Sequence, residues 1–472
     1  MRERRALGRV LAALLTLALL LPPGAALADD RPSGSVVSVA ASPDGYTYLV
    51  DGRRETVRGM GYNAMLGQRS EDERAALLSR DFAMMRRVGI NTVLGWDRAT
   101  FDRTLLDVAE ASGLGVIMHF ELGKGWNYAD PALQEQLLGE IGDWVIANRD
   151  HPALRMWGVG NEVLLTTGDE ESRAFAQFYV RVYQTVRRLD PRHPLVYREA
   201  EDVRVPYFRD AFAAAGVQPE GFVFGMNFYT PRIEEALAQW PEHGFPVPVL
   251  VSEFAPAGIA PSQRPEGFRE MWQRVQAHDR LVLGAAPYVW TTVGPEAVDR
   301  LFGLTDGQGR PVDWALAELQ RLYRGPEAGD EPLPPPRPRA DSALGVSIET
   351  AEAQLLARAM TLPGVEPIDV AATRARWRAL YQADLVNNAP GFEGADPARI
   401  DRMLDLLAGV AVLAELRREE QPVYGGAVEA LPLLAGMARW SAVDPQAPLV
   451  AEAFLSEVLA QALHLSRSID ES

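Results

Sequence analysis

Eight short apolar runs, alternating with longer amphipathic stretches, constrain the fold of this chain more than any other feature of its sequence. Apolar strands that alternate with amphipathic helices are typical of a parallel sheet covered by helices on both faces. Eight such units favour an α/β fold in which the sheet closes into a (β/α)8 TIM barrel. The apolar runs lie at 56–62, 90–96, 115–121, 154–162, 195–198, 222–228, 247–253 and 281–290, and helical stretches lie at 72–88, 132–147, 172–189 and 265–277.

An open dinucleotide-binding sheet is excluded, because no apolar run is followed by a Gly-x-Gly-x-x-Gly turn. Residues 46–50, the turn residues 51–52 and the segment from Glu55 onward predict a hairpin that leads into the first unit. We therefore expect the barrel domain to span residues 46–324.

A proline-rich segment divides the chain after the barrel. Five prolines between residues 332 and 338 fix φ and remove backbone donors, so residues 325–345 are expected to form an extended linker. Beyond it, apolar residues recur at helical spacing behind a helix start at Asp396-Pro397, and residues 449–465 are also strongly helical. We expect residues 346–472 to form a separate all-α C-terminal domain, whose role the sequence does not assign.

The first 28 residues have the layout of a bacterial secretory signal peptide. An arginine-rich start precedes an apolar run at 10–21, a Pro-Pro-Gly break and the small-x-small triplet 26–28. The apolar run is short for a membrane span. We expect cleavage after Ala28, a secreted or cell-envelope location without an integral membrane span, and an N-terminal extension over 29–45; an uncleaved anchor is the alternative.

The composition narrows the classes of partner. The chain carries a net charge of −17 at pH 7. It contains no cysteine, and this absence excludes a disulfide scaffold. An acidic surface repels phosphate backbones and anionic lipid, and the sequence shows no basic patch that would offset this repulsion. We expect a neutral or cationic ligand and no nucleic-acid partner.

Motifs for cofactor chemistry are absent from the sequence. The six histidines are scattered, and there is no His-Glu-x-x-His motif, no calcium-binding loop, no Gly-x-Ser-x-Gly elbow and no phosphate-binding glycine loop. The expectation is therefore an enzyme without a metal or another cofactor.

A barrel places its active site at the carboxyl ends of its strands, so the last residue of each run matters most. The fourth and seventh runs are otherwise apolar and end in Glu162 and Glu253. Their positions across the ring allow the two carboxyl groups to converge, and two facing carboxyl groups carry out glycoside hydrolysis. The alternative for each is a salt-bridged carboxylate at the rim of the barrel.

Other residues at the ends of the runs are candidates for substrate binding. Trp96, Trp126 and Tyr128 are expected to line outer subsites, because sugar faces stack on aromatic rings, with loop packing as the alternative. His119 either touches the substrate or is a packed, hydrogen-bonded residue. Further candidates at the ends of the runs are Asp97, Glu199 and Asn227.

Two motifs carry a resemblance to a known family. Residues 157–162, WGVGNE, and residues 249–254, VLVSEF, resemble the strand-four and strand-seven motifs of clan A retaining glycoside hydrolases. The barrel domains of families 2 and 5 are the most similar, and the resemblance covers about residues 43–323.

The resemblance implies a role for each residue of the two motifs and for their neighbours. Glu162 would be the acid/base, Glu253 the nucleophile and Asn161 the partner of the sugar 2-hydroxyl. Tyr229 would donate a hydrogen bond that orients Glu253, and Trp290 would be the platform under the reacting sugar, with core packing as its alternative.

The chain departs from the family pattern at one charge. Many members carry an arginine near the end of strand two, behind the nucleophile, where this chain reads VLGWD at 93–97. Arg98 and Arg198 are the candidates to replace the charge that keeps the nucleophile ionised.

Three functions are compatible with these residues. The first is a retaining hydrolase of β-linked glycans. The second is a β-glycan transglycosylase that uses the same two glutamates, and the third is a non-catalytic carbohydrate-binding barrel.

Overall fold

The computed structural model describes part of the chain. The described residues run from 34 to 422, except for 68, 166, 203, 230–231, 257–263, 297–298, 326–331, 337–347, 362, 389–396 and 419–420. The predicted signal peptide, most of the predicted linker and the predicted helix at 449–465 lie outside these residues.

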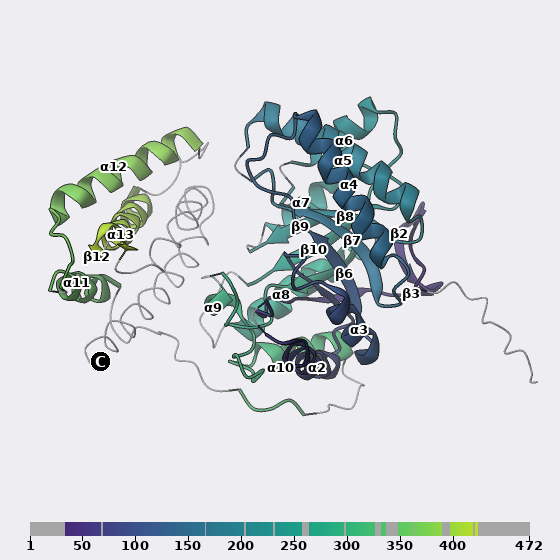
Figure 1. The fold of residues 1–472 in the computed structure, drawn as a ribbon, viewed down its shortest axis with the longest axis horizontal. Helices are drawn as coiled ribbons and strands as arrows, with labels where there is room; N and C mark the ends of the chain where they lie inside the picture. Colours follow the sequence, from purple (N-terminus) through teal and green to yellow (C-terminus); the bar gives the residue numbers. More distant parts are fainter. Residues whose placement is uncertain are drawn as a thin grey trace, which may run out of the picture.

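Eight parallel strands close into a barrel, which confirms the predicted fold class (Figure 1). The ring order is β10-β11-β4-β5-β6-β7-β8-β9, so each strand but one neighbours the strand that follows it in the chain, and the first and last meet. The strands are β4 (Val57–Gly61), β5 (Thr92–Leu94), β6 (Gly115–Phe120), β7 (Leu154–Asn161), β8 (Leu195–Ala200), β9 (Phe222–Phe228), β10 (Val249–Phe254) and β11 (Val282–Pro287).

Helices surround the strands and are delimited by local capping signals (Figure 1). Ser70 and Glu73 form a capping box at the start of the first of these helices, and Gly89 ends it with a φ of 93°, a conformation that favours glycine. The helices are α2 (Glu71–Val88), α3 (Arg103–Ser112), α4 (Pro131–Asn148), α5 (Asp169–Leu189), α6 (Val205–Ala214), α7 (Ile233–Gln239), α8 (Arg264–Ala277), α9 (Asp299–Phe302) and α10 (Ala315–Arg324), with a 3-10 turn η1 (Trp240–His243).

A small antiparallel sheet lies against the amino-terminal end of the barrel. The predicted hairpin is present as β2 (Gly45–Val50) and β3 (Arg53–Arg54), and β1 (Val37–Ser42) pairs along β2. Val37 and Val50 from this sheet share one apolar cluster with interior residues of the barrel strands. Strand β1 lies inside the segment expected to be only an extension, and it closes the bottom of the barrel.

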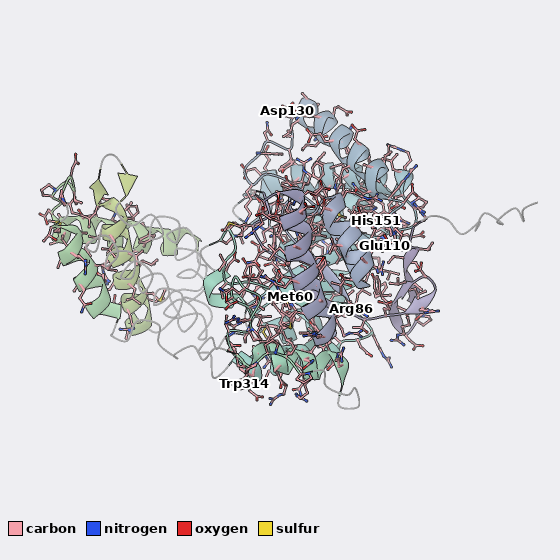
Figure 2. The ribbon with its side chains drawn as sticks, turned by 60° about the horizontal axis from the view of Figure 1, so that its bottom comes forward. Met60, Arg86, Glu110, Asp130, His151 and Trp314 are labelled. Carbon is pink, nitrogen blue, oxygen red and sulfur yellow. The ribbon has the colours of Figure 1, made fainter. Side chains whose placement is uncertain are left out.

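A buried polar group connects the start of the described chain to the barrel. The Asp190 carboxylate accepts hydrogen bonds from Trp157 Nε1 at 2.8 Å and from His193 Nδ1 at 2.6 Å, and Ser35 Oγ lies 3.0 Å from His193 Nε2. All of these side chains are buried. A second histidine, His151, meets α3 through Asp107 and Glu110 (Figure 2).

Replacing Asp190 with alanine is expected to lower the free energy of unfolding by about 3 kcal/mol, because it leaves several buried donors without a partner. Asp210→Ala is the matched control, since this carboxylate is exposed and, among the described residues, pairs only with Arg209; its effect should stay within about 0.5 kcal/mol. Denaturant titrations of both variants measure the difference. Equal midpoints would show that Asp190 has no structural role.

The described part of the C-terminal region is mainly helical, as predicted, and contains α11 (Ile348–Ala359), α12 (Val370–Asn388) and α13 (Pro397–Glu415). Two short strands, β12 (Arg417–Arg418) and β13 (Gln421–Pro422), follow. The predicted stripe on α13 is buried: Ile400, Met403, Leu404, Leu407, Val410 and Leu413. Ion pairs such as Arg378–Asp401 join α12 to α13. Within the described part of the chain, no helix combines the length and apolarity needed to span a membrane.

Candidate active site

The two predicted glutamates stand at the carboxyl ends of β7 and β10. Glu162 directly follows β7, and Glu253 is the penultimate residue of β10. Two strands, β8 and β9, separate β7 from β10 on one side of the ring and four on the other. Glu253 is buried, whereas the Glu162 side chain is 19% exposed. One carboxyl group is thus enclosed and the other borders solvent at the same end of the barrel.

Glu253 is held by donors from two other strand ends. Trp96 Nε1 donates to its Oε1 at 2.7 Å, and Tyr229 OH donates to its Oε2 at 2.5 Å. Burial, followed by the nearby Glu162 carboxylate, raises the pKa of Glu253 to about 7, against the opposing effects of Arg198 and the two donors. The site therefore gives Glu253 a fixed orientation and an ionisation near neutral pH.

Glu162 is held by an amide from β9. Asn227 Nδ2 donates to Glu162 Oε1 at 2.9 Å and to Asn161 Oδ1 at 3.2 Å, and its own Oδ1 accepts from Ser252 Oγ at 2.8 Å. Glu162 has a φ of 49°, an uncommon conformation for a residue with a side chain. One chain of hydrogen bonds thus joins the ends of β7, β9 and β10.

Arg198 places a positive charge near Glu253, whereas β5, the second strand of the barrel, carries no arginine at its carboxyl end. It lies on β8, is 1% exposed, and donates through one terminal nitrogen to Gly95 O and to His119 Nδ1, both at 2.7 Å. Its charge lowers the pKa of Glu253. The other candidate, Arg98, is instead paired with Glu121.

Space for Arg198 comes from the neighbouring strand. A Cβ at Gly225 would lie 2.8 Å from Arg198 Cγ and 2.9 Å from Ser252 Oγ. Any larger residue at position 225 would therefore displace the arginine or the serine beneath the two glutamates.

His119 is a packed residue, as the alternative expectation stated. Its ring is buried and accepts from Arg198. Burial, followed by the charges of Arg198 and Arg98, holds the pKa of His119 well below its usual value. A neutral imidazole that accepts through Nδ1 orients Arg198.

Trp290 does not border the site, and the platform prediction for it is wrong. Its side chain is fully buried in the core, so the ring presents no surface to a sugar. Tyr288 lies beside the two donors of Glu253: its ring centroid lies 5.1 Å from that of Trp96 and 5.8 Å from that of Tyr229. Its OH donates to Asp299 Oδ1 at 2.7 Å.

The loop between β6 and α4 contributes residues on the Glu162 side. Lys124 Nζ lies 3.6 Å from Glu162 Oε2, a contact that the sequence did not indicate. Trp126, two residues further, is 47% exposed, while Tyr128 is buried against Phe175 and Phe178. Trp126 is thus available to a ligand and Tyr128 is core.

Two other acidic candidates have structural partners. Asp97 caps the turn at Thr100 N. Glu199 is fully buried and accepts from Tyr197 OH at 2.6 Å and Leu164 N at 3.2 Å, which fixes the segment after Glu162. Burial raises the pKa of Glu199 to about 7.

Metal-ligand side chains do not gather in this site. Among the described residues, no group of three or more histidine, cysteine, aspartate or glutamate side chains is arranged to hold a metal ion. The chemistry available to the described site is that of two carboxyl groups, an arginine and several hydrogen-bond donors.

Residues 48–283 match the family model "Glycosyl hydrolases family 2, TIM barrel domain". No curated protein matches the chain. Solved structures that resemble it include a GH2 beta-galacturonidase from Eisenbergiella tayi bound to galacturonate, at 17% identity and a TM-score of 0.48 over 61% of this chain and 54% of the other. A beta-D-glucuronidase from Dictyoglomus thermophilum has 16% identity and a TM-score of 0.46 over 62% and 54%. A Bacteroides uniformis beta-glucuronidase has 14% identity and a TM-score of 0.49 over 61% and 37%. The chain thus spans about half or less of the length of these proteins.

Proposed function

Because the chain belongs to glycosyl hydrolase family 2 through its TIM barrel domain, we propose that it is a retaining glycosidase that cleaves β-linked glycosidic bonds of a glycan through a covalent glycosyl-enzyme. The observation that carries the proposal is the environment of Glu253. Trp96 and Tyr229 each donate a hydrogen bond to one oxygen of Glu253, and the positive charge of Arg198 lowers its pKa. The second carboxyl group, that of Glu162, accepts a hydrogen bond from Asn227.

In the first step, an oxygen of ionised Glu253 bonds to the anomeric carbon while the glycosidic C–O bond breaks. Glu162 gives its proton to the departing oxygen. In the second step, the Glu162 carboxylate takes a proton from water, whose oxygen attacks the anomeric carbon and releases Glu253 as a carboxylate. Two displacements leave the sugar with its original configuration.

Hydrogen-bond donors around the nucleophile perform two tasks in this scheme. Tyr229 and Trp96 fix the plane of the Glu253 carboxylate, and together with Arg198 they favour its ionised form. Asn161 is proposed to meet the sugar 2-hydroxyl, and Tyr288 is proposed to replace Trp290 as the aromatic surface under the reacting sugar.

Because the charge of Glu162 affects the pKa of Glu253, a substitution at Glu162 should shift the pH dependence of the activity in a predictable direction. Burial and the negative charge of Glu162 raise the pKa of Glu253. Glu162→Gln removes that charge, so the pKa of Glu253 should fall. The acid limb of kcat/KM for an aryl glycoside with an activated leaving group should then move to lower pH.

Glu121→Gln is the matched control for this shift, since Glu121 is a strand-end carboxylate paired with Arg98. The acid limb of kcat/KM for the Glu121→Gln variant should lie at the same pH as that of the unmodified protein. An acid limb that stays in place or rises in the Glu162→Gln variant would show that Glu162 does not set the ionisation of Glu253.

A panel of aryl β-glycosides tests the proposed activity directly. Glucoside, galactoside, mannoside, glucuronide and galacturonide versions with one activated leaving group differ only in the sugar. Release from at least one, with loss of release in Glu253→Gln, supports the proposal. No release from any of them, nor from short β-linked oligosaccharides, would contradict it.

A further inference from the structure

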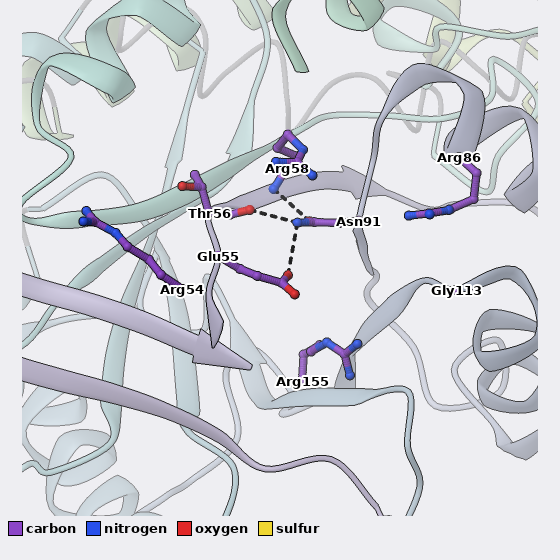
Figure 3. A pocket seen from close by; sticks show the side chains of 8 residues that line it. All are labelled: Arg54, Glu55, Thr56, Arg58, Arg86, Asn91, Gly113 and Arg155. Carbon is purple, nitrogen blue, oxygen red and sulfur yellow. Dashed lines mark hydrogen bonds between the residues drawn. The ribbon is translucent and has the colours of Figure 1, made fainter. Parts of the chain in front are cut away.

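A pocket of about 540 Å³ lies at the opposite end of the barrel from the two glutamates. Its walls come from segments that begin or immediately precede β4, β5, β6 and β7, and from the ends of α2 and α3. Four of its lining residues are arginines, and we call it the arginine pocket (Figure 3). It is lined by Arg54, Glu55, Thr56, Arg58, Arg86, Asn91, Gly113 and Arg155.

The four guanidinium groups form no ion pair with a carboxylate of the described residues. Arg58 Nε donates to Gly89 O at 2.9 Å, and Arg155 donates to Pro152 O at 2.9 Å, so these two partly satisfy backbone carbonyls. The side chains of Arg54 and Arg86 are exposed and donate to no described group. Elsewhere, arginines such as Arg98 and Arg378 are paired with acids, and the chain carries a net charge of −17.

One acid is present in the arginine pocket, and it offsets only one of the four positive charges. Glu55 Oε2 accepts from Asn91 Nδ2 at 3.4 Å, and the same amide nitrogen donates to Thr56 O at 2.9 Å (Figure 3). The pocket therefore has an excess of three positive charges. Like charges gathered in one concave surface repel each other unless an anion lies between them.

The packing also positions individual arginines at the wall. A Cβ at Gly115 would lie 2.3 Å from Arg155 Cγ, so the absence of a side chain at the start of β6 lets Arg155 lie along the strand. Arg86 is in the last turn of α2 (Figure 2). Its Cζ lies 3.8 Å from the position of a Cβ on Gly113. Arg155, at the start of β7, and Arg86, near the end of α2, therefore line the pocket beside Gly115 and Gly113.

We propose that the arginine pocket binds a doubly charged oxyanion, a phosphate or a sulfate group, either free or as an ester on a sugar. Guanidinium groups recognise such anions through paired, charge-assisted hydrogen bonds. A single carboxylate would offset only one of the three excess charges. The volume admits the anion together with a sugar to which it is attached.

Isothermal titration calorimetry of the full chain at constant ionic strength tests the proposal. The probes are inorganic phosphate, inorganic sulfate, glucose 6-phosphate and, as a neutral control, glucose. The test variant is Arg54→Gln with Arg86→Gln, because neither side chain supports the backbone. The matched variant is Arg188→Gln with Arg280→Gln, which removes the same charge from exposed positions outside the pocket.

The unmodified protein and the matched variant should bind the anions, glucose should not bind, and the pocket variant should bind at least about tenfold more weakly. Tighter binding of glucose 6-phosphate than of inorganic phosphate would identify an ester as the ligand, and equal binding would identify the free anion. Absence of anion binding, or equal affinity in both variants, would overturn the proposal.

Stability without an anion separates ligand binding from a purely structural role. If the arginines hold an anion, the pocket variant should unfold at the same or a higher temperature than the unmodified protein in anion-free buffer, because repulsion is relieved. If it unfolds at a lower temperature and its phosphate affinity is unchanged, the arginines serve the fold and the proposal fails. Glycosidase activity should be the same in both variants, since the pocket lies at the other end of the barrel.

Discussion

Replacing Glu253 with alanine is expected to abolish the turnover of every glycoside, whatever its leaving group. The variant lacks the oxygen that attacks the anomeric carbon, so no covalent intermediate forms. A loss on the order of 10⁵-fold in kcat/KM is expected. Initial rates with an activated and an unactivated substrate measure it.

Glu253 is buried among polar partners, so a folding control is required. Glu253→Gln keeps the size of the side chain, and its thermal unfolding and circular dichroism should match those of the unmodified protein. A folded Glu253→Gln variant that keeps more than about one hundredth of the activity would contradict the assigned role.

Replacing Glu162 with alanine is expected to give a loss that depends on the leaving group. A poor leaving group needs the proton, so its release should fall by about 10²- to 10⁴-fold. An activated aryl group needs little protonation, so the intermediate on Glu253 should still form and then accumulate. Pre-steady-state release of the aryl group should therefore show a burst followed by slow turnover.

Added azide tests which glutamate is the nucleophile and which is the acid/base. With Glu162→Ala, azide should attack the intermediate, speed its turnover and give a sugar azide of retained configuration. With Glu253→Ala, azide must attack the substrate directly and the product should be inverted. A retained azide from the Glu253 variant would mean that the two roles are reversed.

The fold was predictable because the local signals agree with one another. Apolar runs such as 222–228, buried along their whole length, alternate with capped amphipathic helices such as α2. The two glutamates were predictable for a related reason, since each ends a strand that is otherwise apolar. Strand β1 was missed because its outward residues are exposed and its pattern is weak.

The errors concern residues whose position depends on contacts distant in the sequence. Trp290 was expected at the rim, but its ring is fully buried in the core, and Tyr288 instead lies beside Trp96 and Tyr229. Arg198 was one of two candidates, and it is distinguished from Arg98 by contacts distant in the sequence: Gly225 on β9 leaves space for it, whereas Arg98 is paired with Glu121.

The arginine pocket likewise could not be predicted from the sequence. The four arginines come from three separate segments, 54–58, 86 and 155, so no single stretch of the sequence carries them all. Closure of the barrel brings their strands and helices to one edge. A basic site therefore exists in a chain whose sequence indicates only an acidic surface.

Mass spectrometry of the protein after reaction with a 2-deoxy-2-fluoro aryl β-glycoside tests whether Glu253 forms a covalent glycosyl-enzyme. The fluorine slows both steps and the activated leaving group restores the first, so the glycosyl-enzyme should accumulate. We predict one added fluorosugar, located on the peptide that contains Glu253 and absent from Glu253→Gln. A fluorosugar on Glu162, or hydrolysis of unmodified substrates with inversion and no covalent adduct, would contradict it.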